Sequence, residues 1–159
     1  MKIQLSKGRY AIIDKKDYPA IKHFKWEALV TTHNIYARTY IRGGGYKHVL
    51  MHRLILEFPE NQDIDHVNGN GLDNRRQNIR PCTVSQNNGN AFIRSDNTSG
   101  YKGVYYNGPP AKARRKWVGQ ISVNGIITYL GSFYTAKEAA SAYDKAAIRH
   151  FGKFARVNF

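Results

Sequence analysis

The chain has 159 residues, enough for one domain or two small ones, and carries 25 lysines and arginines against 11 aspartates and glutamates. The net charge of +14 is shared by both halves, because residues 1–90 hold 14 basic and 8 acidic side chains and residues 91–159 hold 11 and 3. A single cysteine excludes an internal disulfide framework and a multi-cysteine zinc site, and no apolar run is long enough to span a bilayer. We expect a cytoplasmic protein that binds a polyanion, with nucleic acid favoured over a membrane surface.

Short alternating segments predict β structure for most of residues 1–50. The expected strands are residues 2–5, 10–13, 26–30, 35–41 and 46–50, with a glycine turn at 43–45. A brief helical turn is predicted at residues 18–23. The first full helix is predicted at residues 51–57, ended by Pro59.

From Ile64 onward the pattern is strand, long polar loop, strand and short helix. Residues 68–71 alternate asparagine and glycine, which tolerate positive φ and favour turns. Residues 79–82 resume an extended segment, and Thr83 or Ser85 can cap a helix over residues 86–90. This order predicts a ββα unit.

The second half predicts a three-stranded antiparallel sheet backed by one helix. Residues 91–98 have the composition of a linker, and the expected strands are residues 101–106, 116–123 and 126–133. Asn124 and Gly125 predict a hairpin between the last two strands, and Thr135 with Glu138 predicts a capping box. A stripe of alanines lets the following helix lie close to the sheet, so the fold class is α+β.

Asp65 and His66, at the end of the predicted strand, are the first candidates for chemistry. A carboxylate is a hard metal ligand, and imidazole, with a pKa near ~6.5, accepts a proton at neutral pH. Together they suit metal-assisted cleavage of a phosphodiester. On a regular strand the two side chains point to opposite faces, so the residue pattern alone leaves the catalytic role open. His52 is open between a role beside this site and a packing role, with packing favoured.

Several separated blocks resemble the HNH nuclease motif in its phage homing-endonuclease form. They are residues 65–69, 73–75, 78–80 and 85–88, preceded by a similar segment at 51–55. The resemblance covers residues 46–90 and implies that Asp65 and Asn87 hold one divalent metal ion, Mg²⁺ or Mn²⁺, with Asn88 as the alternative to Asn87. It implies further that His66 is the general base and that Asn78 hydrogen-bonds across the loop and holds His66. Phosphate contacts are expected from the basic residues of the segment, with a merely solvated face as the alternative: Arg75, Arg76 and Arg80.

Residues 99–159 resemble the AP2 DNA-binding domain, through the segments 99–104, 116–121, 130–133, 138–147 and 151–159. The resemblance implies that the sheet enters the major groove while the helix supports it from behind. The positions that match the reading face are Lys102, Tyr105, Asn107, Gln120, Ser122 and Tyr129. A basic turn is expected to hold the DNA backbone: Arg114, Arg115 and Lys116. Plant members carry arginines and a tryptophan at several reading positions, so their target sequence does not transfer.

The sequence therefore predicts a nuclease domain at residues 1–90 with a β-rich extension, a linker at 91–98 and a DNA-reading domain at 99–159. The expected activity is metal-dependent hydrolysis of double-stranded DNA to a 5′-phosphate and a 3′-hydroxyl, without a small-molecule cofactor. A phage-encoded homing enzyme, monomeric and acting inside a bacterial host, is the expected setting. The alternatives are a DNA-binding transcriptional regulator with an inactive nuclease domain and, less favoured, a binder of structured RNA.

Overall fold

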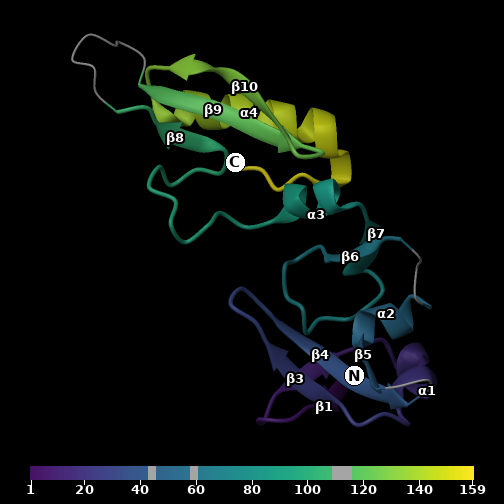
Figure 1. Ribbon diagram of the computed structural model, residues 1–159. Coiled ribbons are helices and arrows are strands. Elements are labelled where there is room, and N and C mark those ends of the chain that lie inside the picture. Colours follow the sequence, from purple (N-terminus) through teal and green to yellow (C-terminus); the bar gives the residue numbers. More distant parts are fainter. Residues whose placement is uncertain (43–45, 58–60, 109–115) are drawn as a thin grey trace. The chain divides into compact units, whose positions relative to one another are not determined.

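The computed structural model describes residues 1–42, 46–57, 61–108 and 116–159 (Figure 1). The chain divides into two compact units, Met1–Cys82 and Thr83–Phe159. Both combine small antiparallel sheets with helices, which confirms the predicted α+β class. The functional division predicted from the sequence, with a linker at 91–98, stays a prediction. Within the described ranges, no helix is long and apolar enough to cross a membrane.

The first unit contains a hairpin, a three-stranded sheet and a second two-stranded sheet, all antiparallel. Its strands are β1 (Lys2–Gln4), β2 (Tyr10–Ile12), β3 (Glu27–Val30), β4 (Ile35–Arg42), β5 (Tyr46–Leu50), β6 (Asp63–His66) and β7 (Ile79–Cys82). Its helices are η1 (Lys15–Asp17), α1 (Tyr18–Ile21) and α2 (Met51–Ile55). Every strand predicted in this half is present. The predicted turn at 43–45 and the helix stop at Pro59 lie outside the described residues.

One apolar core joins the N-terminal strands to the motif segment of the first unit. Met51 and Ile55 on α2 and Ile64 on β6 pack in the same buried cluster as Ile13 and Trp26. Because α2 and β6 are anchored in one core, His52 on α2 and His66 at the end of β6 are both held on rigid elements.

The long loop that joins β6 to β7, residues 67–78, is fastened to strand β2. The backbone N–H of Ile12 donates to Leu72 O at 2.8 Å, and Asn74 N donates to Ile12 O at 2.7 Å. These two bonds continue the edge of the β1–β2 hairpin into the loop. The polar, glycine-containing loop predicted from the sequence therefore has a defined path.

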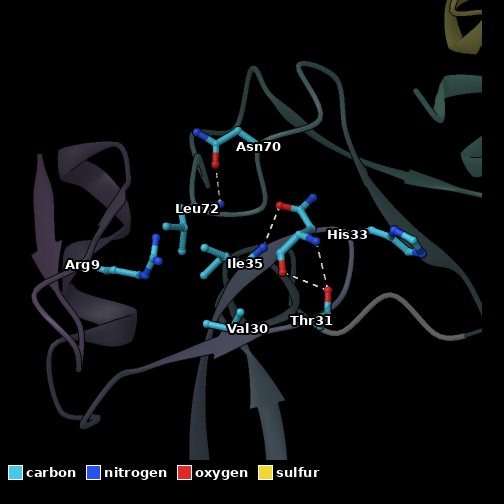
Figure 2. A pocket seen from close by; sticks show the side chains of 8 residues that line it. Arg9, Val30, Thr31, His33, Ile35, Asn70 and Leu72 are labelled. Carbon is cyan, nitrogen blue, oxygen red and sulfur yellow. Dashed lines mark hydrogen bonds between the residues drawn. The ribbon is translucent and has the colours of Figure 1, made fainter. Parts of the chain in front are cut away.

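Asn34, just before β4, holds the other side of this loop. Its Nδ2 donates to Gly69 O at 2.9 Å, and its Oδ1 accepts from Gly71 N at 3.1 Å. A Cβ added at Gly71 would lie 2.6 Å from the Tyr36 ring, so only glycine allows this close approach. An open pocket of about 460 Å³ lies beside Asn34, and neither Asp65 nor His66 lines it. Figure 2 shows the side chains that line this pocket.

The second unit has one sheet, in the order β10-β9-β8, covered by a long helix (Figure 1). Its elements are α3 (Val84–Asn90), β8 (Val104–Tyr106), β9 (Trp117–Val123), β10 (Ile126–Phe133), α4 (Ala136–Phe151) and η2 (Gly152–Phe154). The predicted three-stranded antiparallel sheet is confirmed, as is the hairpin turn, where Asn124 and Gly125 have φ of +51° and +81°. Thr83 and Thr135 each form a capping box. Ala139, Ala140 and Ala147 are fully buried, as the alanine stripe predicted.

Substitution of two glycines tests how tightly the sheet of the second unit packs on α4. Gly103 and Gly100 both have positive φ, +73° and +76°, but a Cβ at Gly103 would overlap the Tyr143 ring, whereas nothing lies within 4 Å of one at Gly100. We expect Gly103→Ala to lower the free energy of unfolding by about 3 kcal/mol or more, and Gly100→Ala by about 1 kcal/mol, from backbone strain alone. Urea denaturation of both variants measures the difference, and equal losses would contradict the close contact with Tyr143.

Candidate active site and DNA-reading surface

His66 lies at the end of β6 and is 5% exposed. Its Nε2 is 3.4 Å from Asn74 Oδ1. An amide oxygen can only accept, so this contact places the imidazole proton on Nε2 and leaves Nδ1 as the basic nitrogen. Burial lowers the pKa of His66, and the Asn74 contact and the charges of Asp65 and Asp73 oppose that shift in part. The ring is therefore neutral at neutral pH, the form that accepts a proton.

Two further rings enclose His66. His52 on α2 meets it edge to face with ring centroids 5.0 Å apart, and Tyr36 on β4 lies 5.9 Å from each histidine. Burial, followed by the charges of His66 and Arg53, lowers the pKa of His52 to about 3. His52, whose role the sequence left open, thus packs directly on the candidate base as a neutral ring.

Two buried polar atoms beside this cluster, His52 Nδ1 and Asn74 Nδ2, have no hydrogen-bond partner within the described parts of the chain. Such atoms are uncommon in folded proteins. Their position next to His66 separates this cluster from an ordinary apolar core. Tyr36 and Asn74 were missed by the sequence analysis, because an aromatic residue on a strand and one more asparagine in a turn-rich loop carry no distinguishing signal.

Asn78 bridges the loop from its far end. Its Nδ2 donates to Asp73 O at 2.7 Å, its Oδ1 accepts from Asn68 N at 2.9 Å, and its own carbonyl accepts from Val67 N at 2.8 Å. Asn78 thereby fixes the residues that directly follow His66. Its role in holding the imidazole itself stays a prediction.

The three arginines expected to contact phosphate each bind a buried aspartate. Their guanidinium groups lie 2.7 to 2.8 Å from carboxylates that are 2 to 5% exposed, in the pairs Arg75–Asp73, Arg76–Asp17 and Arg80–Asp65. The guanidinium of Arg75 lowers the pKa of Asp73 below its usual range. Part of each guanidinium group is therefore occupied by a contact with a buried carboxylate. The phosphate contacts of these arginines stay a prediction.

The two residues expected to hold a metal ion belong to different compact units. Asp65 is buried on β6 of the first unit, and Asn87 is half-buried on α3 of the second. A carboxylate and an amide both offer hard oxygen donors, which fits Mg²⁺ or Mn²⁺. Among the residues that the structure describes, no three or more His, Cys, Asp or Glu side chains gather in a group that could hold a metal. The assignment of Asp65 and Asn87 as metal ligands stays a prediction.

Four of the predicted DNA-reading residues share one face of the sheet in the second unit. The register places Tyr129 opposite Gln120 and Ile127 opposite Ser122, and Tyr105 opposite Val118. Gly119 lies between Val118 and Gln120 on β9. It faces α4, because a Cβ there would lie 3.2 Å from Ala139 O. By strand alternation, Tyr105, Gln120, Ser122 and Tyr129 thus lie on the face away from α4.

The remaining predicted DNA contacts are placed differently. Asn107 is exposed just after β8, where its backbone N–H donates to Lys116 O at 2.8 Å. Lys102 points into the second unit and donates to backbone carbonyls near the end of α3. Arg114 and Arg115 lie outside the described residues.

Comparison with known proteins supports the two resemblances in part. An uncharacterized HNH endonuclease of Acanthamoeba polyphaga mimivirus is 28% identical over 154 residues, which cover 96% of this chain and 76% of the viral protein. The chain is a distant relative of that endonuclease. Protein 3.8 of Escherichia phage T7 is 33% identical over 67 residues, or 42% of this chain and 52% of the phage protein.

A third relative is the dehydration-responsive element-binding protein 2A of Arabidopsis thaliana, 52% identical over 46 residues. This match covers 28% of the chain and only 14% of the plant protein. No family model matches the chain, and no solved structure matches it. The relatives therefore point to a nuclease and to DNA binding, without fixing the site residues.

The neutral state of His52 predicts how stability depends on pH. The unfolded chain takes up a proton at His52 near pH 6.5, but the folded chain does so only near pH 3, so acid favours unfolding across that window. We expect about 2 kcal/mol of this loss between pH 6.5 and 5, and we expect His52→Phe to remove it. Urea denaturation at several pH values measures the slope. The same slope in His52→Phe as in the parent would contradict the burial of a neutral His52.

Proposed function

We propose that this protein is a metal-dependent DNA endonuclease of the homing type, producing a 5′-phosphate and a 3′-hydroxyl. The observation that carries the proposal is the buried, neutral His66, oriented by Asn74 and adjacent to the Asp65 carboxylate. The distant similarity to an HNH endonuclease and the charge of +14 support it. The expected setting, a phage-encoded monomer in a bacterial host, is part of the same proposal.

His66 is the general base of this reaction. Its Nδ1 takes a proton from the attacking water, while Asn74 holds Nε2 and Asn78 keeps the adjoining loop in place. A divalent ion held by Asp65 and Asn87 would stabilise charge on the scissile phosphate and on the departing 3′ oxygen. Arg75, Arg76 and Arg80 use the exposed part of their guanidinium groups to contact neighbouring phosphates.

The second unit supplies selectivity. Gln120 and Ser122 present hydrogen-bonding groups on the outer face of the sheet, with Tyr105 and Tyr129 beside them, and Lys116 and the adjacent arginines hold the DNA backbone. A reader joined to a cutter of low selectivity raises the local concentration of the active site at the target.

A DNA-binding regulator with an inactive nuclease domain is the second candidate. It is favoured by the match to a plant element-binding protein, 52% identical over 46 residues. Both candidates require DNA binding, so cleavage separates them.

The decisive experiment incubates the full-length protein with supercoiled plasmid and with phage genomic DNA, in Mg²⁺, in Mn²⁺ or in EDTA. We expect metal-dependent strand cleavage that falls by about 100-fold or more in His66→Ala, because a general base contributes that much. His23→Ala, at an exposed histidine, should cleave normally. Tight DNA binding with no cleavage in any metal would favour the regulator, and cleavage unaffected by His66→Ala would refute the assigned base.

The assignment of the reading face predicts a contrast between two faces of the same sheet. Gln120 lies on the face away from α4, whereas Thr128 is exposed on the strand position opposite Ile121, on the other face. We expect Gln120→Ala to weaken discrimination at one base pair by about 10-fold or more, as for the loss of a base-edge hydrogen bond, and Thr128→Ala to leave preference unchanged. Selection from a random DNA pool measures both. Equal effects of the two variants would show that this face does not read sequence.

A further inference from the structure

Helix α3, which carries Asn87, folds as part of the second unit and is held there by a half-buried cation, Lys102. The Lys102 Nζ donates to Gly89 O at 2.6 Å, to Ala91 O at 2.7 Å and to Asn88 O at 3.3 Å. An ammonium has three N–H groups, and these carbonyls use all of them. Burial, followed by the charge of Arg156, lowers the pKa of Lys102 to about 8, as expected for an ammonium withdrawn from water.

Arg156, in the C-terminal segment, binds the same end of α3 as Lys102. Its Nε donates to Asn90 O at 2.7 Å and its backbone N–H to Gly89 O at 3.0 Å. The guanidinium also lies 3.8 Å from the centroid of the Phe92 ring. The carbonyls at the end of a helix have no intrahelical partner and carry partial negative charge, so two cations there stabilise the helix.

The rest of α3 is also seated on the second unit. A Cβ at Gly89 would lie 2.7 Å from the Phe151 ring of α4, so this close packing requires glycine. At the other end, Ser85 Oγ accepts a hydrogen bond of 2.9 Å from Asn124 N, in the turn between β9 and β10. Figure 1 shows α3 beside the C-terminal segment that contains Arg156.

These contacts matter because α3 has little helical stability of its own. It has seven residues, four of which are asparagine or glycine, residues that disfavour helix. Isolated helices this short are marginal in water, so tertiary contacts must supply the stability. The form of α3 thus depends on the unit that also carries the reading face.

We infer that Lys102 is a positioning residue, which together with Arg156 holds α3 in the form that presents Asn87 to the metal ion. The inference rests on the proposed function, in which Asn87 is a metal ligand. It makes a ligand-bearing helix an integral part of the DNA-reading unit. It also replaces the expected DNA contact of Lys102, since an ammonium that satisfies three carbonyls has no N–H left for phosphate.

The test compares full-length Lys102→Met, Lys102→Arg and Lys145→Met, the last at an exposed lysine of α4. Lys102→Met removes hydrogen bonds from a charged donor, which lowers the local stability of α3. We therefore expect amide hydrogen exchange across residues 84–91 to be about 10-fold faster in metal-free Lys102→Met than in the parent. Cleavage kcat should fall by about 10-fold or more, while the Kd for DNA in EDTA stays within about twofold. Lys102→Arg should recover most of the protection, and Lys145→Met should match the parent.

Two results with Lys102→Met are each enough to overturn the inference. One is unchanged exchange in α3 of Lys102→Met. The other is a Kd for DNA weakened about 10-fold with cleavage of bound DNA intact, the result expected of a phosphate contact. If Lys102→Met loosens β9 and β10 as well, Gly89→Ala provides the second test, because its methyl group displaces α3 from Phe151 without removing the cation. Unchanged cleavage by Gly89→Ala would then refute the positioning role.

Asn87→Ala separates this inference from the proposed function. Normal cleavage by Asn87→Ala would remove Asn87 from the metal site and so refute that part of the proposed function. Hydrogen exchange in Lys102→Met would still decide, without metal or DNA, whether Lys102 holds α3. Loss of cleavage in Asn87→Ala together with normal cleavage in Lys102→Met would reject the positioning role alone.

Discussion

The pairing of three buried carboxylates with three arginines from one short segment is the constraint on which the first unit depends. Residues 75–80 supply the guanidinium groups for Asp73, Asp17 and Asp65, which are 2 to 5% exposed. Burying a carboxylate without a partner costs several kcal/mol of folding free energy. The arginines of residues 75–80 offset this cost by pairing with the three aspartates. The strong positive charge of the chain therefore serves its interior as well as a polyanionic partner, and Arg80 is part of the reason that Asp65 can occupy a buried strand.

The same burial sets the chemistry of the histidines. His52 and His66 have ring centroids 5.0 Å apart in a site of low exposure, where two positive charges would repel each other with little solvent screening. Both rings are therefore held neutral, and a neutral imidazole is what a general base requires. The N-terminal strands contribute directly to this state, because Tyr36 of β4 contacts both rings and Asn34 holds the loop that supplies Asn74. The N-terminal strands thus form one side of the candidate site.

Local signals were enough to predict the elements, and long-range contacts were the part that sequence could not supply. Thr83 and Thr135 cap their helices through partners three residues away, and Asn124–Gly125 closes a hairpin, so each could be recognised within a few residues. The contact between His66 and Asn74 depends instead on how the loop folds back onto β2. Lys102 shows the same limit, since its position in a motif suggested a DNA contact, whereas its acceptors lie in α3 and in the segment predicted to be a linker.

Under the proposed function, the dependence of α3 on contacts with the second unit has a consequence for selectivity. Hydrogen bonds from a charged donor contribute about 1.5–3 kcal/mol, which is about 10- to 100-fold in the population of a correctly formed α3. Lys102 donates to three carbonyls near the end of α3 and lies two residues before β8, so one residue connects the helix to the first strand of the sheet. The second unit, which recognises DNA in that proposal, also determines how well Asn87 is presented to the metal ion. Recognition and cleavage are then linked by contacts inside the second unit as well as by the covalent connection between the two units.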